Sequence, residues 1–93
     1  MEKKVRAHVI ITGRVQGVFF RYETMQAAQE RNIFGWVRNR QDRSVEALFE
    51  GAQANVVAML EWCKEGPPLA NVKQVQVEWE DFAGEFSRFE ITS

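Results

Sequence analysis

The chain has 93 residues, a formal net charge of −1 and a single cysteine, Cys63. This length suits one domain, residues 1–93 with a core of about 5–93, and 45% hydrophobic and 27% charged residues are typical of a folded globular protein. The balanced charge argues against a broad nucleic-acid or membrane surface, although it leaves room for a small anion site. A lone cysteine forms no intrachain disulfide, and the apolar runs are too short for a signal sequence or membrane span. We therefore expect a cytoplasmic monomer.

The first third of the chain reads as a strand, a loop and a helix. Residues 5–12 alternate apolar and polar side chains, which predicts a strand. Gly13 and Gly17 then bracket a tight loop. Good helix formers fill residues 20–31, and Asn32 is expected to end this helix in the left-handed conformation.

The rest of the chain continues the same alternation of strands and helices. Its apolar residues recur with period two in some segments and with helical spacing in one. The further elements predicted are strands at 33–39 and 44–50, a helix at 52–65, a strand at 72–79 and a short strand at 89–91. The order β-α-β-β-α-β with a short extra C-terminal strand predicts an α+β fold, a ferredoxin-like two-layer sandwich. Its mostly antiparallel sheet would carry both helices on one face.

Four side chains with reactive or charged groups receive structural interpretations. His8 has no cysteine or carboxylate at a metal-ligand spacing, so we expect it to be structural. Cys63 lies on the apolar stripe of the second predicted helix and is expected in the core. Glu46 and Glu50 share one strand face, which we interpret as facing solvent.

The junction between the first strand and the first helix carries the strongest functional signal. Amide groups at a helix start have no partners within the helix, and with the helix dipole they form an anion site. Gly13 and Gly17 permit a concave backbone on which several N–H groups converge. Arg21, in the first helical turn, opposes the dipole, and a bound phosphate would reverse that cost because the guanidinium pairs with two phosphate oxygens. The alternative is a solvated arginine beside an ordinary turn.

Asn39 is the second candidate, because it stands where the second predicted strand ends. Asparagine is disfavoured inside strands and common in turns. The position therefore suggests either a turn residue of the hairpin or a polar group of a site, and the residues alone leave both open.

Two separated segments resemble the signatures of the acylphosphatase family. Residues 13–21, GRVQGVFFR, resemble the first signature. Residues 35–39, GWVRN, followed by residues 44–46 and Gly51, resemble the second. The similarity covers nearly the whole chain, and the family's ferredoxin-like fold agrees with the element order above.

Two residues depart from the family pattern. Arg43 stands where the hairpin turn usually has glycine, and a left-handed arginine there would carry strain of roughly 1 kcal/mol. Asn32 replaces a glycine that often ends the first helix.

The resemblance implies a hydrolase that converts acyl phosphates to a carboxylate and inorganic phosphate without a metal or cofactor. It implies that Arg21 binds the phosphoryl group and that Asn39 positions the attacking water. We expect an in-line, substrate-assisted attack on phosphorus. Arg14 is expected to add positive potential. The implied cradle is the loop backbone of Gln16, Gly17, Val18, Phe19 and Phe20.

Two other functional classes are compatible with the fold class. An RNA-binding module would need displayed aromatic residues and a basic surround, and residues 45–49 lack that pattern. A non-catalytic acylphosphatase-like module, with a regulatory or interaction role, is the second alternative. The presence of both Arg21 and Asn39 argues against it.

Overall fold

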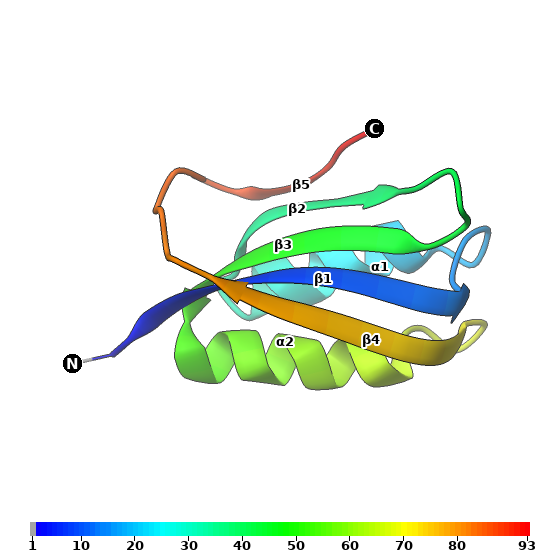
Figure 1. The fold of residues 1–93 in the computed structure, drawn as a ribbon, viewed down its shortest axis with the longest axis horizontal. Helices are drawn as coiled ribbons and strands as arrows, with labels where there is room; N and C mark the ends of the chain where they lie inside the picture. Colours follow the sequence, from blue (N-terminus) through cyan, green and yellow to red (C-terminus); the bar gives the residue numbers. More distant parts are fainter. Residues whose placement is uncertain (1) are drawn as a thin grey trace.

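The computed structural model of the chain describes residues 2–93. Within them, five strands form one sheet in the order β4-β1-β3-β2-β5. Both helices cover the same face of this sheet (Figure 1), which confirms the predicted ferredoxin-like sandwich. No helix in this part of the chain has the length and apolar character needed to span a membrane. In chain order the elements are β1 (Lys4–Arg14), α1 (Phe20–Glu30), β2 (Phe34–Asn39), β3 (Val45–Ala52), α2 (Gln53–Glu65), β4 (Asn71–Glu80) and β5 (Phe89–Ile91).

The strand directions place the ends of β1 and β2 together. Both strands pair antiparallel with β3, which lies between them, so they run in the same direction. Val45 of β3 lies opposite Ile11 of β1 on one side and opposite Asn39 of β2 on the other. The loop that leaves β1 and the last residue of β2 therefore lie at the same end of the sheet. β4 pairs antiparallel with β1, and β5 pairs parallel with β2.

The core lies between the sheet and the two helices. Alternate residues of β1 and β3 point into it, as their period-two patterns predict. Burial of each large apolar side chain contributes roughly 1.5–3 kcal/mol. The fully buried core residues with no accessible surface include Ala7, Val9, Ile11, Val45, Ala47, Phe49, Val56, Met59 and Cys63.

The prediction that Glu46 and Glu50 face solvent is wrong. Glu46 is only 9% exposed and Glu50 only 2% exposed. Both lie on the sheet face away from the helices, as the alternation indicates, but neighbouring groups cover them. Arg6 pairs with Glu50 at 3.5 Å, and the amides of Ala83 and Gly84 donate to its carboxylate at 2.9 and 3.2 Å. The segment after β4 thus folds over the end of β3, a long-range contact that periodicity does not reveal.

Local backbone features match the predictions in two places and differ in one. Asn32 has φ 55° and Arg43 has φ 75°, so both adopt the left-handed conformation expected of them. β1 extends to Arg14, however, with a register irregularity between Thr12 and Gly13. The predicted loop from Gly13 therefore begins inside the strand, because a bulge lets the ladder with β4 continue.

Candidate active site

The β1–α1 loop, residues 15–19, is pinned to the core by its apolar side chains. Val15 is 1% exposed and Val18 is 4% exposed. With these side chains turned inward, the backbone between them forms the outer surface of the loop. Gly17 has φ 74°, a left-handed conformation in which a side chain is strained although the space around it is open. The glycine is therefore needed for the turn itself and not for close packing.

Phe19, the residue just before α1, has an unusual backbone conformation. It is the N-cap residue, with φ 63° and ψ 21°, and it makes no side-chain capping hydrogen bond. A left-handed aromatic residue is rare, and such strain costs on the order of 1–3 kcal/mol and clusters at functional sites. Because no side chain caps the helix, its first amide groups remain open to an external anion. Sequence reasoning missed this feature, since an aromatic residue gives no sign of a left-handed conformation.

The structure brings the two predicted catalytic side chains into one pocket. Arg21 is the second residue of α1, and Asn39 is the last residue of β2. Arg21 is exposed, and within residues 2–93 it takes part in no ion pair. The pocket holds about 370 Å³ and is lined by Val15, Gly17, Phe19, Phe20, Arg21, Tyr22, Asn39 and Ile91.

Gln16 joins the loop to the β2–β3 hairpin. Its side-chain amide donates to the carbonyl oxygens of Arg40 at 2.8 Å and Ser44 at 2.9 Å. The Ser44 hydroxyl and amide in turn donate to Asp42, and these hydrogen bonds hold the pKa of Asp42 below its ordinary value. The turn that follows Asn39 is therefore held by its own hydrogen bonds between Ser44 and Asp42, and Gln16 attaches it to the loop. This side-chain role was not predicted, because the partners are backbone atoms about 24–28 residues away.

The remaining predicted site residues lie around the pocket without all lining it. Gln16 and Val18 flank the lining residues of the loop. Arg14, at the end of β1, is exposed and is not among the lining residues. Its electrostatic contribution to the site stays a prediction.

Three exposed apolar or aromatic side chains line the pocket. Phe19, Tyr22 and Ile91 line it and are 71%, 49% and 38% exposed. Exposed large apolar side chains beside a polar site are a common feature of small-molecule pockets. Sequence reasoning did not place Ile91 here, because β5 reaches the site only through its pairing with β2.

Two reactive side chains outside the pocket have other surroundings. Cys63 is fully buried, and burial raises the pKa of its thiol to about 12, so it serves as the predicted core residue.

His8 lies on the outer face of the sheet, where its Nε2 is 2.5 Å from Glu46. Arg38 donates to the other oxygen of Glu46 at 2.6 Å. Burial alone would raise the pKa of Glu46, but these hydrogen bonds outweigh it and lower the pKa.

The comparisons with known proteins agree on one family. The acylphosphatase family model matches residues 7–91. An acylphosphatase of Syntrophobacter fumaroxidans is 55% identical over 92 residues, covering 99% of this chain and 94% of the relative. One of Pelotomaculum thermopropionicum is 51% identical over 88 residues, covering 95% and 96%. The crystal structure of acylphosphatase from Bacillus subtilis superposes with a TM-score of 0.93 at 36% identity, covering 96% of this chain and 99% of that one.

The fold and the site together define a ferredoxin-like protein with a pocket at its first strand–helix junction that Arg21 and Asn39 share. The chain belongs to the acylphosphatase family. This confirms the predicted family and the predicted class of activity, an acylphosphatase, and no comparison favours the non-catalytic alternative.

Proposed function

We propose that this chain hydrolyses acyl phosphates in the pocket between the β1–α1 loop and the end of β2. The observation that carries the proposal is the meeting of Arg21, Asn39 and the uncapped start of α1 in one pocket of about 370 Å³. A cation, a neutral water-binding group and a set of free amides are the groups that phosphoryl transfer requires.

The phosphoryl group binds to the loop and to Arg21. The amides of Gly17, Phe19 and Phe20 belong to residues that line the pocket. Arg21 shares that pocket and has no competing carboxylate among the described residues, so its planar fork is available for two phosphoryl oxygens. These donors stabilise the charge that spreads over the equatorial oxygens as the bond to the leaving group lengthens.

Asn39 orients the attacking water. Its side-chain carbonyl accepts a hydrogen bond from the water, which attacks phosphorus in line with the acyl oxygen. A new P–O bond forms to the water oxygen, and the P–O bond to the acyl group breaks. The bonding electrons leave with the acyl carboxylate, and both protons of the water end on phosphate oxygens. A carboxylate is a stable leaving group and needs no general acid.

The acyl group lies against the exposed apolar and aromatic side chains of the pocket. Phe19, Tyr22 and Ile91 offer aromatic and aliphatic surface but no charged group to select one acyl chain. We therefore expect turnover of both aromatic and aliphatic acyl phosphates, with inorganic phosphate as product and competing anion.

Steady-state hydrolysis of benzoyl phosphate in the presence of EDTA tests the proposal. The wild type is expected to turn over, and chelation is expected to leave the rate unchanged. Arg21→Ala and Asn39→Ala are each expected to lower kcat by at least about 10²–10³-fold, the usual effect of losing one preorganised donor. Arg21→Ala should also weaken inhibition by phosphate, whereas Asn39→Ala should preserve it.

Two exposed or partly exposed residues on other elements supply matched controls. Arg88→Ala removes an arginine side chain in the segment before β5, and Asn55→Ala removes an asparagine side chain on α2. Neither residue lines the pocket. Both are expected to retain wild-type kcat. A folded wild type without turnover would overturn the enzymatic proposal, and full activity of Asn39→Ala would overturn the role assigned to its amide.

We also propose that the chain acts as a single-domain monomer in the cytoplasm. The free, buried Cys63 is compatible with a reducing compartment. Light scattering coupled to size exclusion tests the monomer directly, and a concentration-independent dimer would contradict it.

A further inference from the structure

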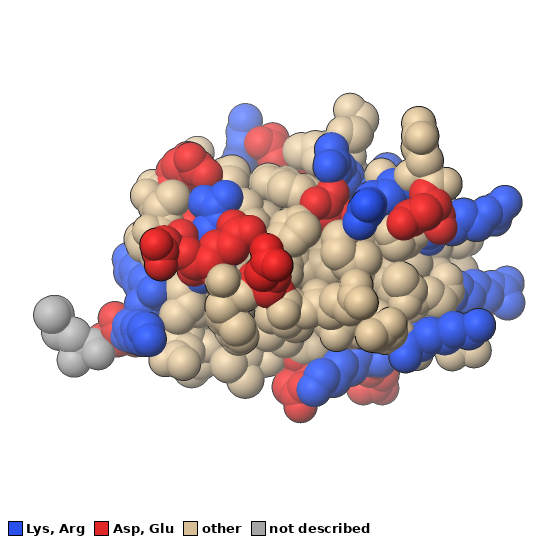
Figure 2. Space-filling model, viewed as in Figure 1, with Lys and Arg blue, Asp and Glu red and all other residues tan. Residues whose placement is uncertain are grey.

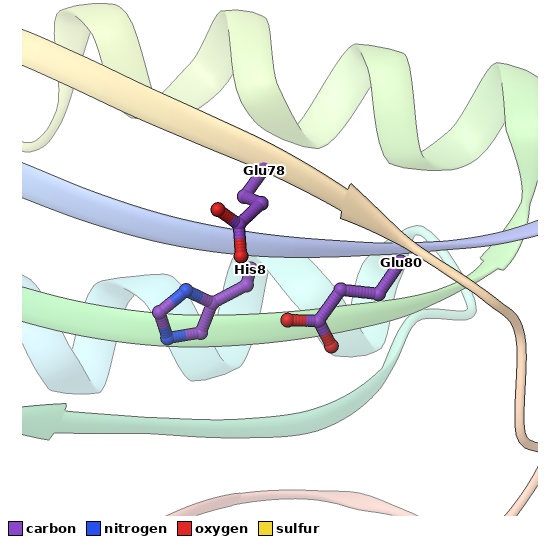
Figure 3. A group of neighbouring side chains, drawn as sticks. All are labelled: His8, Glu78 and Glu80. Carbon is purple, nitrogen blue, oxygen red and sulfur yellow. The ribbon is translucent and has the colours of Figure 1, made fainter.

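A second polar cluster lies on the sheet face opposite the helices. His8 on β1 and Glu78 on β4 are direct cross-strand partners, and Glu80 follows two residues later on the same face. Figure 3 shows the three side chains projecting from this face. One ligand atom from each residue lies within 4.8 Å of the other two. This spacing brings one imidazole and two carboxylates within reach of a common ion.

A hydrogen bond from Nε2 to Glu46 already fixes the orientation of the His8 ring. Its Nε2 lies 2.5 Å from Glu46 Oε2, and because an ionised carboxylate only accepts, Nε2 carries the proton. Nδ1 of neutral His8 therefore keeps its lone pair. Glu46 is itself held by Arg38, whose Nε donates at 2.6 Å. A carboxylate behind the imidazole is the arrangement that fixes metal-binding histidines in proteins.

The charged groups around this cluster are mostly acidic, and one of its two carboxylates, that of Glu78, is not engaged by a basic side chain of the described residues. Arg6 pairs with Glu80 at 3.1 Å and with Glu85 at 2.9 Å. Glu78 has no ion-pair partner within residues 2–93. Figure 2 shows acidic side chains gathered around basic ones on this face. If a cation takes one oxygen of Glu80, Arg6 retains Glu85 as a partner.

We propose that His8, Glu78 and Glu80 bind one zinc ion on the outer face of the sheet. An imidazole nitrogen with carboxylate oxygens suits zinc, whereas magnesium and calcium prefer oxygen ligands alone. Rotation of the exposed Glu78 and Glu80 side chains brings their oxygens to about 2 Å from a shared ion, with water completing the coordination. The ion links β1 to the edge strand β4.

This site is separate from the catalytic pocket. The pocket begins at Val15, just beyond the end of β1, and His8 lies six residues before the last residue of that strand, Arg14, a distance of about 20 Å at the rise of a strand. Its side chain also points away from the face that carries α1. Zinc is therefore expected to stabilise the sheet without entering the hydrolytic reaction.

The test is a zinc titration of the untagged, metal-free protein, followed by calorimetry and by NMR of the imidazole nitrogens. His8 is the only histidine of the chain, so its ring signals report on this site alone. We expect one zinc per chain, a shift of the Nδ1 resonance on binding, and a higher Tm with zinc than with magnesium. Benzoyl phosphate hydrolysis is expected to be the same before and after zinc removal.

Variants separate this site from incidental binding. His8→Asn and Glu78→Gln are expected to abolish the zinc-dependent rise in Tm, whereas Glu61→Gln, on the exposed face of α2, should retain it. Glu46→Gln leaves the ligands in place and should weaken zinc affinity about 10–100-fold. An unchanged Nδ1 resonance in the folded wild type, or equal zinc binding by His8→Asn, would overturn the proposal.

Discussion

Gln16 offers the most direct test of how the site is held together. Its amide group donates to two backbone carbonyls of the hairpin, those of Arg40 and Ser44, at 2.8 and 2.9 Å. A typical hydrogen bond contributes about 0.5–1.5 kcal/mol, and the partial exposure of this pair favours the lower half of that range, so Gln16→Ala removes about 1–2 kcal/mol. Asn39 immediately precedes Arg40. If this free energy holds Asn39 against the loop, its loss lowers kcat about 5–30-fold, because 1.36 kcal/mol equals a factor of ten.

Steady-state hydrolysis of benzoyl phosphate and urea unfolding measure the two parts of this prediction. Gln16→Ala is expected to lower kcat more than it weakens phosphate inhibition, because Arg21 and the loop amides stay in place. Gln29→Ala, an exposed residue of α1, is the matched control and should change neither quantity. A folded Gln16→Ala variant whose kcat stays within twofold of wild type would refute the reasoning, since the link would then have no bearing on Asn39.

Three further predictions concern stability and reactivity. Gly13→Ala would place a Cβ 2.3 Å from the Asn71 carbonyl at φ 122°, so urea unfolding should show a loss of about 3 kcal/mol or more; a loss below 1 kcal/mol would contradict the packing. The lowered pKa of Glu46 gives stability that is present above its unfolded pKa and lost as pH falls through the folded value. The difference in unfolding free energy between wild type and Glu46→Gln should therefore be largest at pH 7 and shrink below about pH 4, and a pH-independent difference would count against it. The Cys63 thiol, with its pKa raised to about 12, should react with a disulfide reagent at pH 8 only after unfolding; rapid reaction of the native protein would show that it is accessible.

The fold was predictable because its information is local. Apolar residues with period two or with helical spacing mark each strand and helix, and the short turn at residues 41–43 indicates which strands are neighbours. The meeting of Arg21 and Asn39 in one pocket was also predictable, because β1 and β2 run in the same direction and place their carboxyl ends at the same end of the sheet. The residue types then suggested an anion site.

Features that depend on distant partners were not predictable. Glu50 is buried by groups more than 30 residues away in sequence, and His8 meets its carboxylates only across two strand pairings. The left-handed backbone of Phe19 has no signature in its residue type. Periodicity assigns a side chain to a face of a sheet, but it does not reveal what later covers that face.

The strand order has a consequence for how the chain acquires its structure during synthesis. β1 is made first and lies between β3 and β4, which begin at Val45 and Asn71. One side of β1 can therefore pair only after the chain has reached β3, and the other side only after it has reached β4. Loop-closure entropy must be overcome before these distant contacts form, which slows folding and leaves β1 exposed to other chains in the interval. The topology that brings the ends of β1 and β2 together therefore makes the pairing of the first strand depend on segments that are synthesised later.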